Sequence, residues 1–544
     1  MSSELVAEVI TRLDQLPEIE ADWRRLWAAQ VRPEIFTSFD WSMAAMECRT
    51  DGARPHVAVV RRSSVVVGLL PLLVDRNGLG FLSGARADYN DILVDDADAA
   101  AVIEAALRCA MGPQGPGRGR LAEVPEWSQL ARTINGLPAG LRSRLLVYDE
   151  STCPALRLGR DRDALLKEMT GKKSLKRHEK KLEKFGAISL RHIEDRAEVL
   201  QFLDDFFAQH VTRRVVAGDR SLFLDDEPRR FYKALVMRLD PAKELRFAVL
   251  EAGGRAVAYH YGFEVAGRFT WYKPTFDVDF LDTGVGEVLL KRLLDYLKER
   301  PVHEFDFTRG NESFKDRFSN HRGQNVQLFV HTTASRTRVA GWWWAVKAQA
   351  KQTPWLARLH ARLKKRSIAP AAGRPQATKT PTRAVYRRDL DTSTRQAHID
   401  DSSDARNVAQ LSLRKLAEMS AMESSPATGA RLRRMVERVV NGATCFGVRQ
   451  GDTLRGFALV YIDPVGVSAP RSGAQPAAPQ AAESPRVEFI PAAASTLTAA
   501  DLQAVLDTLL GHYRLESIGL DVDPADHATS SAARQIGGVT SEVR

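Results

Sequence analysis

The stretch that decides the fold reads FTWYKPTFD at 269–277, followed directly by VDFLDTGVGEVLL at 278–290. The first part is typical of a β-strand, and the second is a loop that opens a long helix. Gly284 and Gly286 stand where that helix begins. Two glycines at a helix N-terminus let the backbone approach a ligand and leave N–H groups directed at an anion. A plain turn and helix cap is the competing interpretation of the same glycines.

Strand-like segments surround this stretch on both sides. LRFAVLEA at 245–252 and RAVAYHYGFEVA at 255–266 flank a tight turn at Gly253–Gly254. HEFDFTR at 303–309 follows the helix that is predicted over 284–300. An antiparallel meander with helices on its faces favours α/β layering over a doubly wound parallel sheet. We therefore expect a mixed, largely antiparallel sheet flanked by helices.

The same order of hairpin, helix and strand recurs along the chain. Strands are predicted within 56–84 and 141–160, with a helix over 97–111 between them. A Pro- and Ala-rich linker at 369–384 precedes a further set of helices and hairpins. We expect an N-terminal lobe, a catalytic lobe, a basic Trp-rich linker and a degenerate third lobe. Their expected bounds are 1–158, 159–335, 336–389 and 390–544.

Composition excludes several classes of protein. The 544 residues are 44% hydrophobic and 27% charged, as in globular proteins. The four cysteines are far apart and form no CxxC pair, so neither a zinc ribbon nor a disulfide scaffold is expected, and no metal. No apolar run reaches about 18 residues, and acidic residues interrupt the segment where a signal peptide would be apolar. These features predict a cytoplasmic protein, with peripheral membrane contact left open.

The net charge of +10 is concentrated in two segments. Residues 332–390 contain fourteen Lys and Arg and one acid, and residues 160–186 contain ten basic and five acidic residues. The second segment lies in a helix predicted over 162–185, whose basic residues are typical of a solvated face. The alternative is recruitment of an anionic acceptor or a tRNA acceptor stem. The absence of interleaved aromatic residues argues against sequence-specific recognition of nucleic acid.

A Trp-rich segment is the other outlier in composition. Trp342, Trp343 and Trp344 belong to a basic helical pattern over 341–367. One interpretation is an interfacial helix on an anionic membrane, which makes 336–366 a candidate membrane contact. The other is a helix packed on the lobes. Consecutive tryptophans point all round a helix and form no single stripe, which favours packing.

Seven motifs, in order, carry a resemblance to a known family. They are FTSFDW near residue 40, FLSGARADYNDILV (81–94), RHEKKLEKFG (177–186), HVTRR (210–214), VAYHYGF (257–263), WYKPTFD (271–277) and FDFTRGNESFKDRF (305–318). Together they resemble the CelD-like branch of the GNAT acyltransferase superfamily, associated with cellulose and exopolysaccharide biosynthesis. The resemblance covers residues 5–335 and implies two GNAT-like lobes, similar to Fem-type peptidyltransferases. Residues 282–287 resemble the acyl-CoA pyrophosphate loop of that superfamily, with an acid near its first position.

The resemblance implies transfer of an acyl group from acyl-CoA, for instance acetyl-CoA, to an amine. Such chemistry needs a held thioester, a deprotonated amine and a donor for the oxygen that becomes anionic. The candidate catalytic residues are His260, Asp306 and Glu312, as alternatives for the base, and Lys315 beside the reacting carbonyl. The candidate cofactor-binding residues are Tyr272, Thr283, Gly284, Val285 and Gly286. The candidate acceptor-binding residues are Tyr89, Asp91, Arg213 and Arg309.

Each candidate has a structural alternative. His260 alternates with apolar residues on a strand, which is equally typical of a core histidine. Asp306 stands between two phenylalanines and is equally compatible with a buried, hydrogen-bonded carboxylate. The remaining alternatives are a surface salt-bridge ladder for Arg309, Glu312 and Lys315, a turn cap for Tyr89 and Asp91, and a surface position for Arg213.

Three functions follow from these patterns. The first is an acyl-CoA-dependent N-acyltransferase acting on a small molecule, a saccharide or a peptidoglycan precursor that bears an amine. The second is a Fem-type transferase that uses aminoacyl-tRNA as donor. The third is a non-catalytic scaffold in a polysaccharide-synthesis complex. The acceptor itself is not predicted, because GNAT folds serve many amines.

Overall fold

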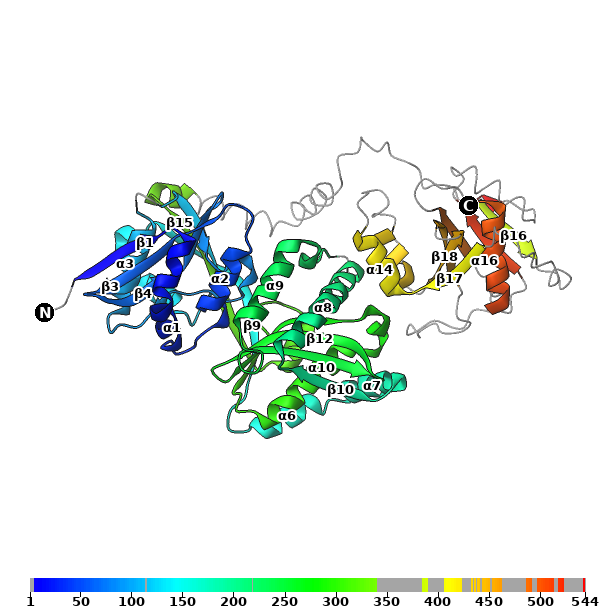
Figure 1. The fold of residues 1–544 in the computed structure, drawn as a ribbon, viewed down its shortest axis with the longest axis horizontal. Coiled ribbons are helices and arrows are strands. Elements are labelled where there is room, and N and C mark those ends of the chain that lie inside the picture. Colours follow the sequence, from blue (N-terminus) through cyan, green and yellow to red (C-terminus); the bar gives the residue numbers. More distant parts are fainter. Residues whose placement is uncertain are drawn as a thin grey trace, which may run out of the picture. The chain divides into compact units, whose positions relative to one another are not determined.

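A computed structural model describes residues 4–112, 115–217 and 219–339, together with separate segments between 384 and 543 (Figure 1). The chain forms two compact units, residues 1–210 with 222–367, and residues 211–221 with 368–544. The helix predicted over 341–367 lies outside the described residues. No helix in the described part of the chain is long and apolar enough to cross a membrane.

The first unit begins with a small antiparallel sheet in the order β1-β3-β4-β7. Its strands are β1 (Leu5–Ile10), β3 (Val57–Arg62), β4 (Val65–Leu70) and β7 (Leu93–Val94). Three helices accompany it: α1 (Glu20–Ala28), α2 (Phe39–Glu47) and α3 (Ala99–Ala110). Apolar side chains of α1, α2 and the sheet form one core cluster that includes Trp23, Phe39 and Leu69. The helix predicted over 97–111 is therefore confirmed as α3.

A second, eleven-stranded sheet runs through the whole first unit in the order β10-β11-β12-β13-β14-β9-β15-β8-β6-β5-β2. Its strands, in that order, are Ile188–Ile193, Leu245–Ala252, Arg255–Val265, Arg268–Phe276, Glu304–Asp306, Leu145–Arg157, His321–His331, Arg118–Pro125, Gly78–Phe81, Leu72–Asp75 and Arg54–Pro55. Only β13–β14 and β6–β8 pair in parallel. The expected fold class, a mixed and largely antiparallel sheet flanked by helices, is confirmed.

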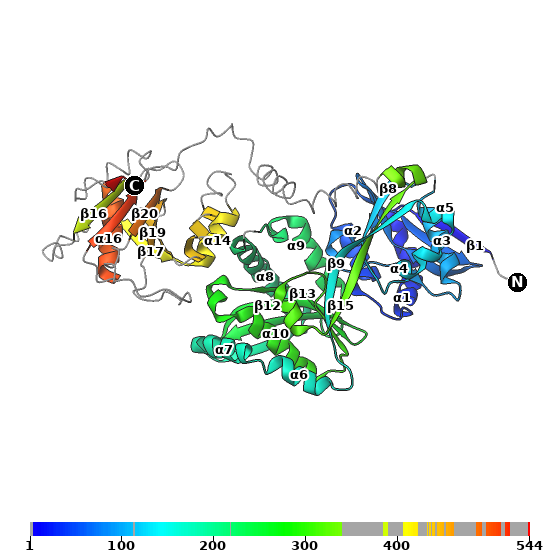
Figure 2. The same cartoon turned by 180° about the vertical axis from the view of Figure 1, so that it is seen from behind.

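The long strands β9 and β15 connect the two predicted lobes (Figure 2). They are antiparallel partners from His321–Ala155 to Val330–Leu145. β15 also pairs with β8, a strand of the predicted N-terminal lobe. The predicted boundary after residue 158 thus falls just beyond β9, inside one compact unit. Two separate strands were expected within 141–160, whereas β9 is continuous, because β15 supplies hydrogen-bonding partners along its length.

Helices cover the faces of the sheet in the second half of this unit. They are α6 (Arg162–Thr170), α7 (Lys173–Leu182), α8 (Arg196–Val216), α9 (Asp226–Arg238), α10 (Val285–Tyr296) and α11 (Ser313–Phe318). Apolar residues of α6, α7 and α10 share one core with β12 and β13. The single helix expected over 162–185 is wrong. Gly171 caps α6 and Lys172 is extended, which breaks the helix there.

The second unit contains a seven-stranded sheet in the order β17-β18-β19-β20-β21-β16-β22. Its strands are β16 (Ala384–Asp389), β17 (Arg406–Leu411), β18 (Thr444–Gln450), β19 (Thr453–Tyr461), β20 (Arg486–Pro491), β21 (Ser517–Val522) and β22 (Glu542–Val543). Helices α14 (Leu413–Met422) and α16 (Ala499–His512) belong to the same unit. Only β20 and β21 pair in parallel, and α16 connects them along the chain.

Candidate active site

Two neighbouring strands part at the centre of the large sheet. β13 and β14 pair in parallel only from Arg268–Glu304 to Thr270–Asp306. β13 then continues to Phe276, whereas β14 ends at Asp306. Side chains that follow this point on the two strands therefore face an opening of the sheet. The predicted loop and the helix α10 begin at the far end of β13.

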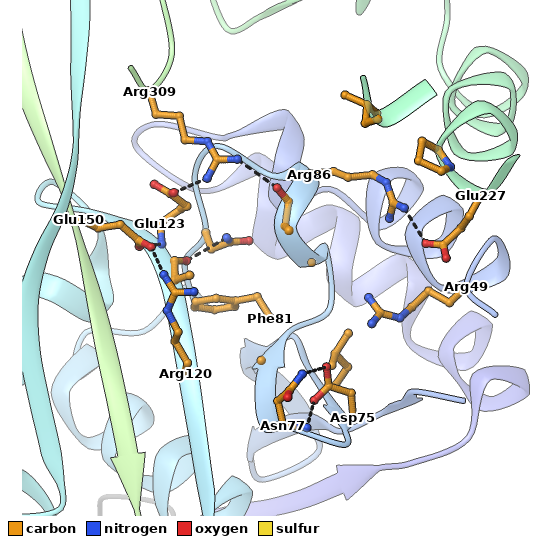
Figure 3. A pocket seen from close by; sticks show the side chains of 18 of the residues that line it. Arg49, Asp75, Asn77, Phe81, Arg86, Arg120, Glu123, Glu150, Glu227 and Arg309 are labelled. Atoms are coloured by element: carbon orange, nitrogen blue, oxygen red, sulfur yellow. Dashed lines mark hydrogen bonds and ion pairs between the residues drawn. The ribbon is translucent and has the colours of Figure 1, made fainter. Parts of the chain in front are cut away.

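A cavity of about 770 Å³ opens beside the parted strands. Tyr272 and Lys273 of β13 line it, as does Arg309, which follows β14. Figure 3 shows one group of charged residues on one side, which contains Arg309, Glu123, Glu150 and Arg120. A second group on the other side contains Arg49, Arg86 and Glu227. The volume is within the range of small-molecule sites.

Arg309 is held tightly at the cavity wall. Its Nε lies 2.8 Å from Asp88 Oδ1, its Nη1 bonds to Glu123, and its Nη2 donates to the carbonyl of Ala85 at 3.1 Å. Burial acts to lower the pKa of Arg309, but the carboxylates of Asp88 and Glu123 raise it above its ordinary value. Arg309 is therefore a fixed cation at the point where the strands part.

Glu123 pairs with Arg309 from a strained backbone position on β8. Its φ is +53°, a left-handed conformation that L residues other than glycine rarely adopt. Asn325 and Ser151 each donate to its carboxylate at 2.7 Å. Thr308, next to Arg309, also has a positive φ, of +55°. Strained residues of this kind cluster at functional sites.

The other two described non-glycine residues with positive φ lie elsewhere, in ordinary hairpin turns. Ser63 stands between β3 and β4, and Ala266 stands between β12 and β13. Strain outside hairpin turns is thus confined, among the described residues, to the two that hold Arg309 in place. This concentration makes the Arg309 side of the cavity the candidate functional side.

Glu150, on β9, is the second carboxylate on that side. It accepts the backbone N–H of Glu123 at 2.6 Å and an N–H of Arg120. Burial raises the pKa of Glu150 above its ordinary value. Fewer donors hold this carboxylate than hold Glu123, so Glu150 is the better placed of the two to accept a proton.

Tyr272 is the one predicted cofactor-binding residue that lines the cavity. Its hydroxyl donates to the carbonyl of Arg86 at 2.6 Å and accepts from the Tyr232 hydroxyl at 3.0 Å. Burial raises the pKa of Tyr272 well above its ordinary value, so the phenol is neutral at physiological pH. Its ring packs among aromatic residues of both predicted lobes, for instance Phe36 of the first and Phe263 of the second.

Asp306 and Tyr89, which were predicted separately, are hydrogen-bonded partners. The Tyr89 hydroxyl donates to Asp306 Oδ1 at 2.8 Å, and the Thr308 N–H donates to the same oxygen at 2.7 Å. Burial raises the pKa of Asp306 to about 6, against the opposing effect of Arg32, whose Nη2 lies 3.5 Å from Oδ2. Neither residue lines the cavity. Tyr89 and Asp306 are buried next to the cavity, and the bond from Thr308 to Asp306 fixes the backbone just before Arg309.

Glu312 and Lys315 lie next to Arg309 as well. The buried Lys315 ammonium donates to the carbonyl of Arg309 at 2.8 Å and lies 3.0 Å from Glu312. Glu312 is 59% exposed. The three residues thus form a connected cluster, in which Lys315 supports the backbone of Arg309.

His260 lies in the apolar core of the second lobe. Its ring stacks on Phe269 and Trp271, at centroid distances of 5.4 and 5.2 Å, and its exposed fraction is 0%. Burial lowers the pKa of His260 to about 3. This position agrees with the core-histidine alternative, since the imidazole does not line the cavity.

The predicted pyrophosphate loop is covered by the basic helix α7. Gly284 has a φ of +74°, and an added Cβ would lie 2.6 Å from the His178 ring. His178 Nδ1 lies 3.3 Å from Glu287, in the first turn of α10. Lys181 donates to the carbonyl of Asp282 at 3.0 Å. Lys181 could pair with a phosphate, but the His178 imidazole packs against Gly284 and covers the backbone there.

The other predicted residues have structural positions. Thr283 donates to the carbonyl of Phe280 at 2.6 Å, and Val285 is a buried core residue. Gly286 faces the ring of Phe276. Asp91 accepts the N–H groups of Gln129 and Leu130 at the start of a short helix, which agrees with the cap alternative. Arg213 lies in the last turn of α8.

Several cavity residues were not predicted from the sequence. Glu123 lies on β8, whose period-two pattern at 118–125 follows a Gly/Pro-rich loop and was overlooked. Glu150 lies in the middle of β9, where a break was expected. No local signal distinguishes Arg49 or Glu227 from other charged residues, because only the fold brings them to one cavity. Arg86 belongs to the quoted motif at 81–94 but was not itself predicted as a site residue.

Residues 170–316 match the family model described as an acetyltransferase (GNAT) domain. This segment contains α7, β10–β14 and α10, and therefore the parted strands and Arg309. The chain contains a GNAT domain and is an acyltransferase by class. GNAT domains use acetyl-CoA. No curated protein matches the chain.

Solved structures show a weaker likeness. FemX is 9% identical, over 57% of this chain and 96% of its own, with a TM-score of 0.42. The C-terminal domain of a putative lysylphosphatidylglycerol synthetase from Agrobacterium fabrum is 13% identical, over 60% and 94%, with a TM-score of 0.36. A tandem GNAT protein from the clavulanic acid biosynthesis pathway is 15% identical, over 60% and 99%, with a TM-score of 0.35. Likeness at this level assigns no substrate.

Proposed function

We propose that this protein is an N-acyltransferase that moves an acyl group from acyl-CoA to an amine held in the Arg309 cavity. The observation that carries the proposal is the position of the cavity. It opens where β13 and β14 part, and the segment that matches the GNAT domain supplies one part of its wall. The rest of the wall, which includes Glu123 and Glu150, comes from residues 49–150. Tyr272 and Arg309, from the two parted strands, both line it.

Acyl-CoA supplies a thioester, whose carbon–sulfur bond breaks as the amide bond to the acceptor nitrogen forms. Glu150 accepts the proton that the amine loses, directly or through a water molecule. Its raised pKa brings the carboxylate closer to the pH at which it works. Arg309 provides a fixed positive charge beside the reacting groups. Glu123 and Lys315 position Arg309 and do not themselves transfer a proton.

The cations around the start of α10 are the proposed partners of the donor's phosphates. Lys181 lies on α7 beside the loop. Arg317 Nη1 lies 2.8 Å from Glu287, in the first turn of α10. Phosphate contacts from these side chains need no glycine cradle. The imidazole of His178 has to move if the backbone at Gly284 also takes part.

A direct test is release of free thiol from acetyl-CoA in the presence of amine acceptors, together with the thermal shift that acetyl-CoA causes. We expect acetyl-CoA to raise the melting temperature, and thiol release to depend on the amine. The surface variant Arg108→Gln, which removes an exposed ion pair on α3, is the matched control and should behave as wild type. Absence of both effects with every acyl-CoA tried would refute the proposal.

The covered loop favours a second candidate, an aminoacyl-tRNA-dependent transferase. The His178 ring packs against Gly284, and Glu287 puts a negative charge in the first turn of α10. Five of the seven basic residues in 172–184 lie on α7, the helix that covers this loop. A thermal shift with charged tRNA, and none with any acyl-CoA, would select this candidate.

We further propose a cytoplasmic location and a role in making polysaccharide or other envelope material, as the resemblance to CelD-like proteins implies. The scaffold hypothesis predicts that catalysis is dispensable there. A Glu150→Gln/Arg309→Ala double variant that fully complements a deletion strain would support the scaffold. Loss of complementation with normal protein levels would support the enzyme.

Membrane contact through 336–366 stays a proposal, tested by flotation with anionic vesicles.

A further inference from the structure

The side of the cavity opposite Arg309 has no role in the proposed chemistry. Arg49, just after α2, and Arg86, the last residue of the short 3-10 helix Gly84–Arg86, project there beside Glu227 of α9 (Figure 3). Their side chains are only 13% and 17% exposed. Burying a charged group costs free energy that its partners must offset. The partners of these two guanidinium groups therefore decide whether either group has donors left for a ligand.

Each of these two arginines pairs with one carboxylate, and each pairing uses only some of the N–H donors of the guanidinium group. Arg86 gives one nitrogen, Nη2, to Glu227 at 2.6 Å, and its guanidinium lies over the Phe231 ring at 5.1 Å. Arg49 gives Nε and Nη2 to Asp51, which is 46% exposed and does not line the cavity. Each guanidinium has five N–H donors, which suit a carboxylate or a phosphate. The remaining donors border the cavity.

The two sides of the cavity differ in what they can bind. On the Arg309 side, Glu123 and Glu150 offer carboxylates, which suit an ammonium group. On the other side, Arg49 and Arg86 line the cavity with Glu227. Asp75 also lines the cavity, and its carboxylate accepts the backbone N–H and the side-chain amide of Asn77. We propose that the acceptor amine carries an anionic group, a carboxylate or a phosphate, which binds between Arg49 and Arg86 while the amine points to Glu150. This inference rests on the proposed function for the role of the amine.

Binding alone tests the inference, without acyl transfer. Three amino sugars differ mainly in charge: glucosamine is neutral apart from its amine, muramic acid adds a carboxylate, and glucosamine 6-phosphate adds a phosphate. In titration calorimetry we expect at least one of the two anionic sugars to bind roughly tenfold or more tightly than glucosamine, as for a charge-assisted pair. The tighter of the two identifies the anion. Equal affinities for all three, or no binding of either anionic sugar, would overturn the inference.

Variants locate the anionic group. Arg86→Gln should remove most of the preference for the anionic sugar and leave glucosamine binding unchanged. Glu227→Gln should strengthen binding of the anionic sugar, because it removes the opposing charge on that side. Arg108→Gln, on the surface of α3, should change neither. If Arg86→Gln weakens all three sugars equally with an unchanged melting temperature, the inference fails.

Failure of the inference and failure of the proposed function are distinguishable. Thiol release from acetyl-CoA with an uncharged amine, without a preference for anionic sugars, would retain the transferase and reject the anionic acceptor. A preference for anionic sugars that Arg86→Gln abolishes, without acyl transfer from any acyl-CoA, would retain the anion site and reject the donor.

Discussion

The second lobe and the C-terminal unit repeat one arrangement of strands. In the second lobe an antiparallel meander, β10 to β13, is followed by the helix α10 and the parallel strand β14. In the C-terminal unit the meander β17 to β20 is followed by α16 and the parallel strand β21. In both, the parallel pairing is three residues long, and the earlier strand continues beyond it.

The two arrangements differ at the start of the crossover helix. In α16, the Thr498 N–H and hydroxyl both donate to Asp501, and the Asp501 N–H donates back to the hydroxyl of Thr498. Asp501 is fully buried. In α10, Gly284 makes no side-chain cap, and Lys181 of α7 donates to the carbonyl of Asp282 in the preceding loop. The two helix starts therefore differ: α16 begins with a closed side-chain cap, whereas α10 begins at an uncapped glycine against which His178 packs.

The largest expected effect is on the rate of acyl transfer, which should depend on the cavity of the first unit and not on the C-terminal unit. Glu150→Gln should lower the rate of acyl transfer by about 10³-fold, because the amide cannot accept the amine's proton. Thr498→Ala, in the C-terminal unit, should leave the rate within twofold. In wild type the rate should rise with pH through the raised pKa of Glu150, since the carboxylate is the active form. A pH profile of kcat/KM checks both, and an unchanged profile in Glu150→Gln would contradict the assigned role.

Loss of the fixed cation should have the next largest effect. Arg309→Ala should lower kcat/KM by about 10²-fold, since a misplaced or missing positioning group costs a factor of that order. Lys315→Met should have a smaller effect in the same direction, because Lys315 supports the Arg309 backbone from behind the cavity wall. Steady-state kinetics measure both. If Lys315→Met is the more damaging of the two, Lys315 and not Arg309 acts on the reacting groups.

A variant at the loop that His178 covers should improve binding of acyl-CoA and not weaken it. His178→Ala should uncover Gly284 and tighten acyl-CoA binding by about fivefold, the equivalent of one hydrogen bond gained. Lys181→Ala should weaken it. Titration of the protein with acetyl-CoA measures both affinities, and Thr498→Ala serves as the control. Weaker binding in His178→Ala would mean that the imidazole itself holds the donor.

Acid should weaken the core of the second lobe specifically. Burial lowers the pKa of His260 to about 3 and that of His192 to about 4, whereas both are near 6.5 when exposed. The unfolded chain therefore binds protons below pH 6.5 that the folded chain refuses, so stability is lost as pH falls. The slope is about 1.4 kcal/mol per pH unit for each histidine.

Denaturant unfolding between pH 7 and 5 checks this slope. The C-terminal sheet buries apolar residues such as Phe457 and Leu459 on β19, so its stability should respond less. His260→Phe should make the pH dependence of the first unit shallower by about one proton. An unchanged slope in this variant would show that other groups control the acid response.

The smallest effect concerns the cap itself. Thr498→Ala should destabilise the C-terminal unit by about 1 kcal/mol, the usual value of an N-cap threonine. It should not change the affinity of the protein for acetyl-CoA or the amino sugars. Thermal unfolding and titration measure the two quantities. A loss of donor binding in Thr498→Ala would remove the distinction between the two helix starts.

Local pattern predicted much of the second lobe. The strands predicted over 245–252, 255–266 and 269–277 agree with β11, β12 and β13 to within a residue, because the turns at Gly253–Gly254 and Ala266–Gly267 set their ends. The break of the helix at Gly171 was not predicted, since the basic residues continue across it. β9 was not predicted as one strand, since its continuity depends on β15, which lies far along the chain.

The site was predicted only in part, because some of its contacts join segments that are far apart in the chain. Tyr272 and Arg309 were singled out, and both line the cavity. The bond between Tyr89 and Asp306 joins residues 217 positions apart, and no spacing predicts it. The backbone N–H of Glu123 on β8 donates to the Glu150 carboxylate on β9, and β15 lies between these two strands in the sheet.

The sequence by itself determined the alternation of strands and helices, the acyltransferase class and the region around β13 and β14, because these depend on short-range periodicity and on motifs. Only the tertiary structure decided which charges face one cavity. It placed His260 in the core, His178 over Gly284, and Glu150 beside the site. The physical reason is that burial and charge pairing depend on segments far apart in the chain, whose distances no local pattern contains.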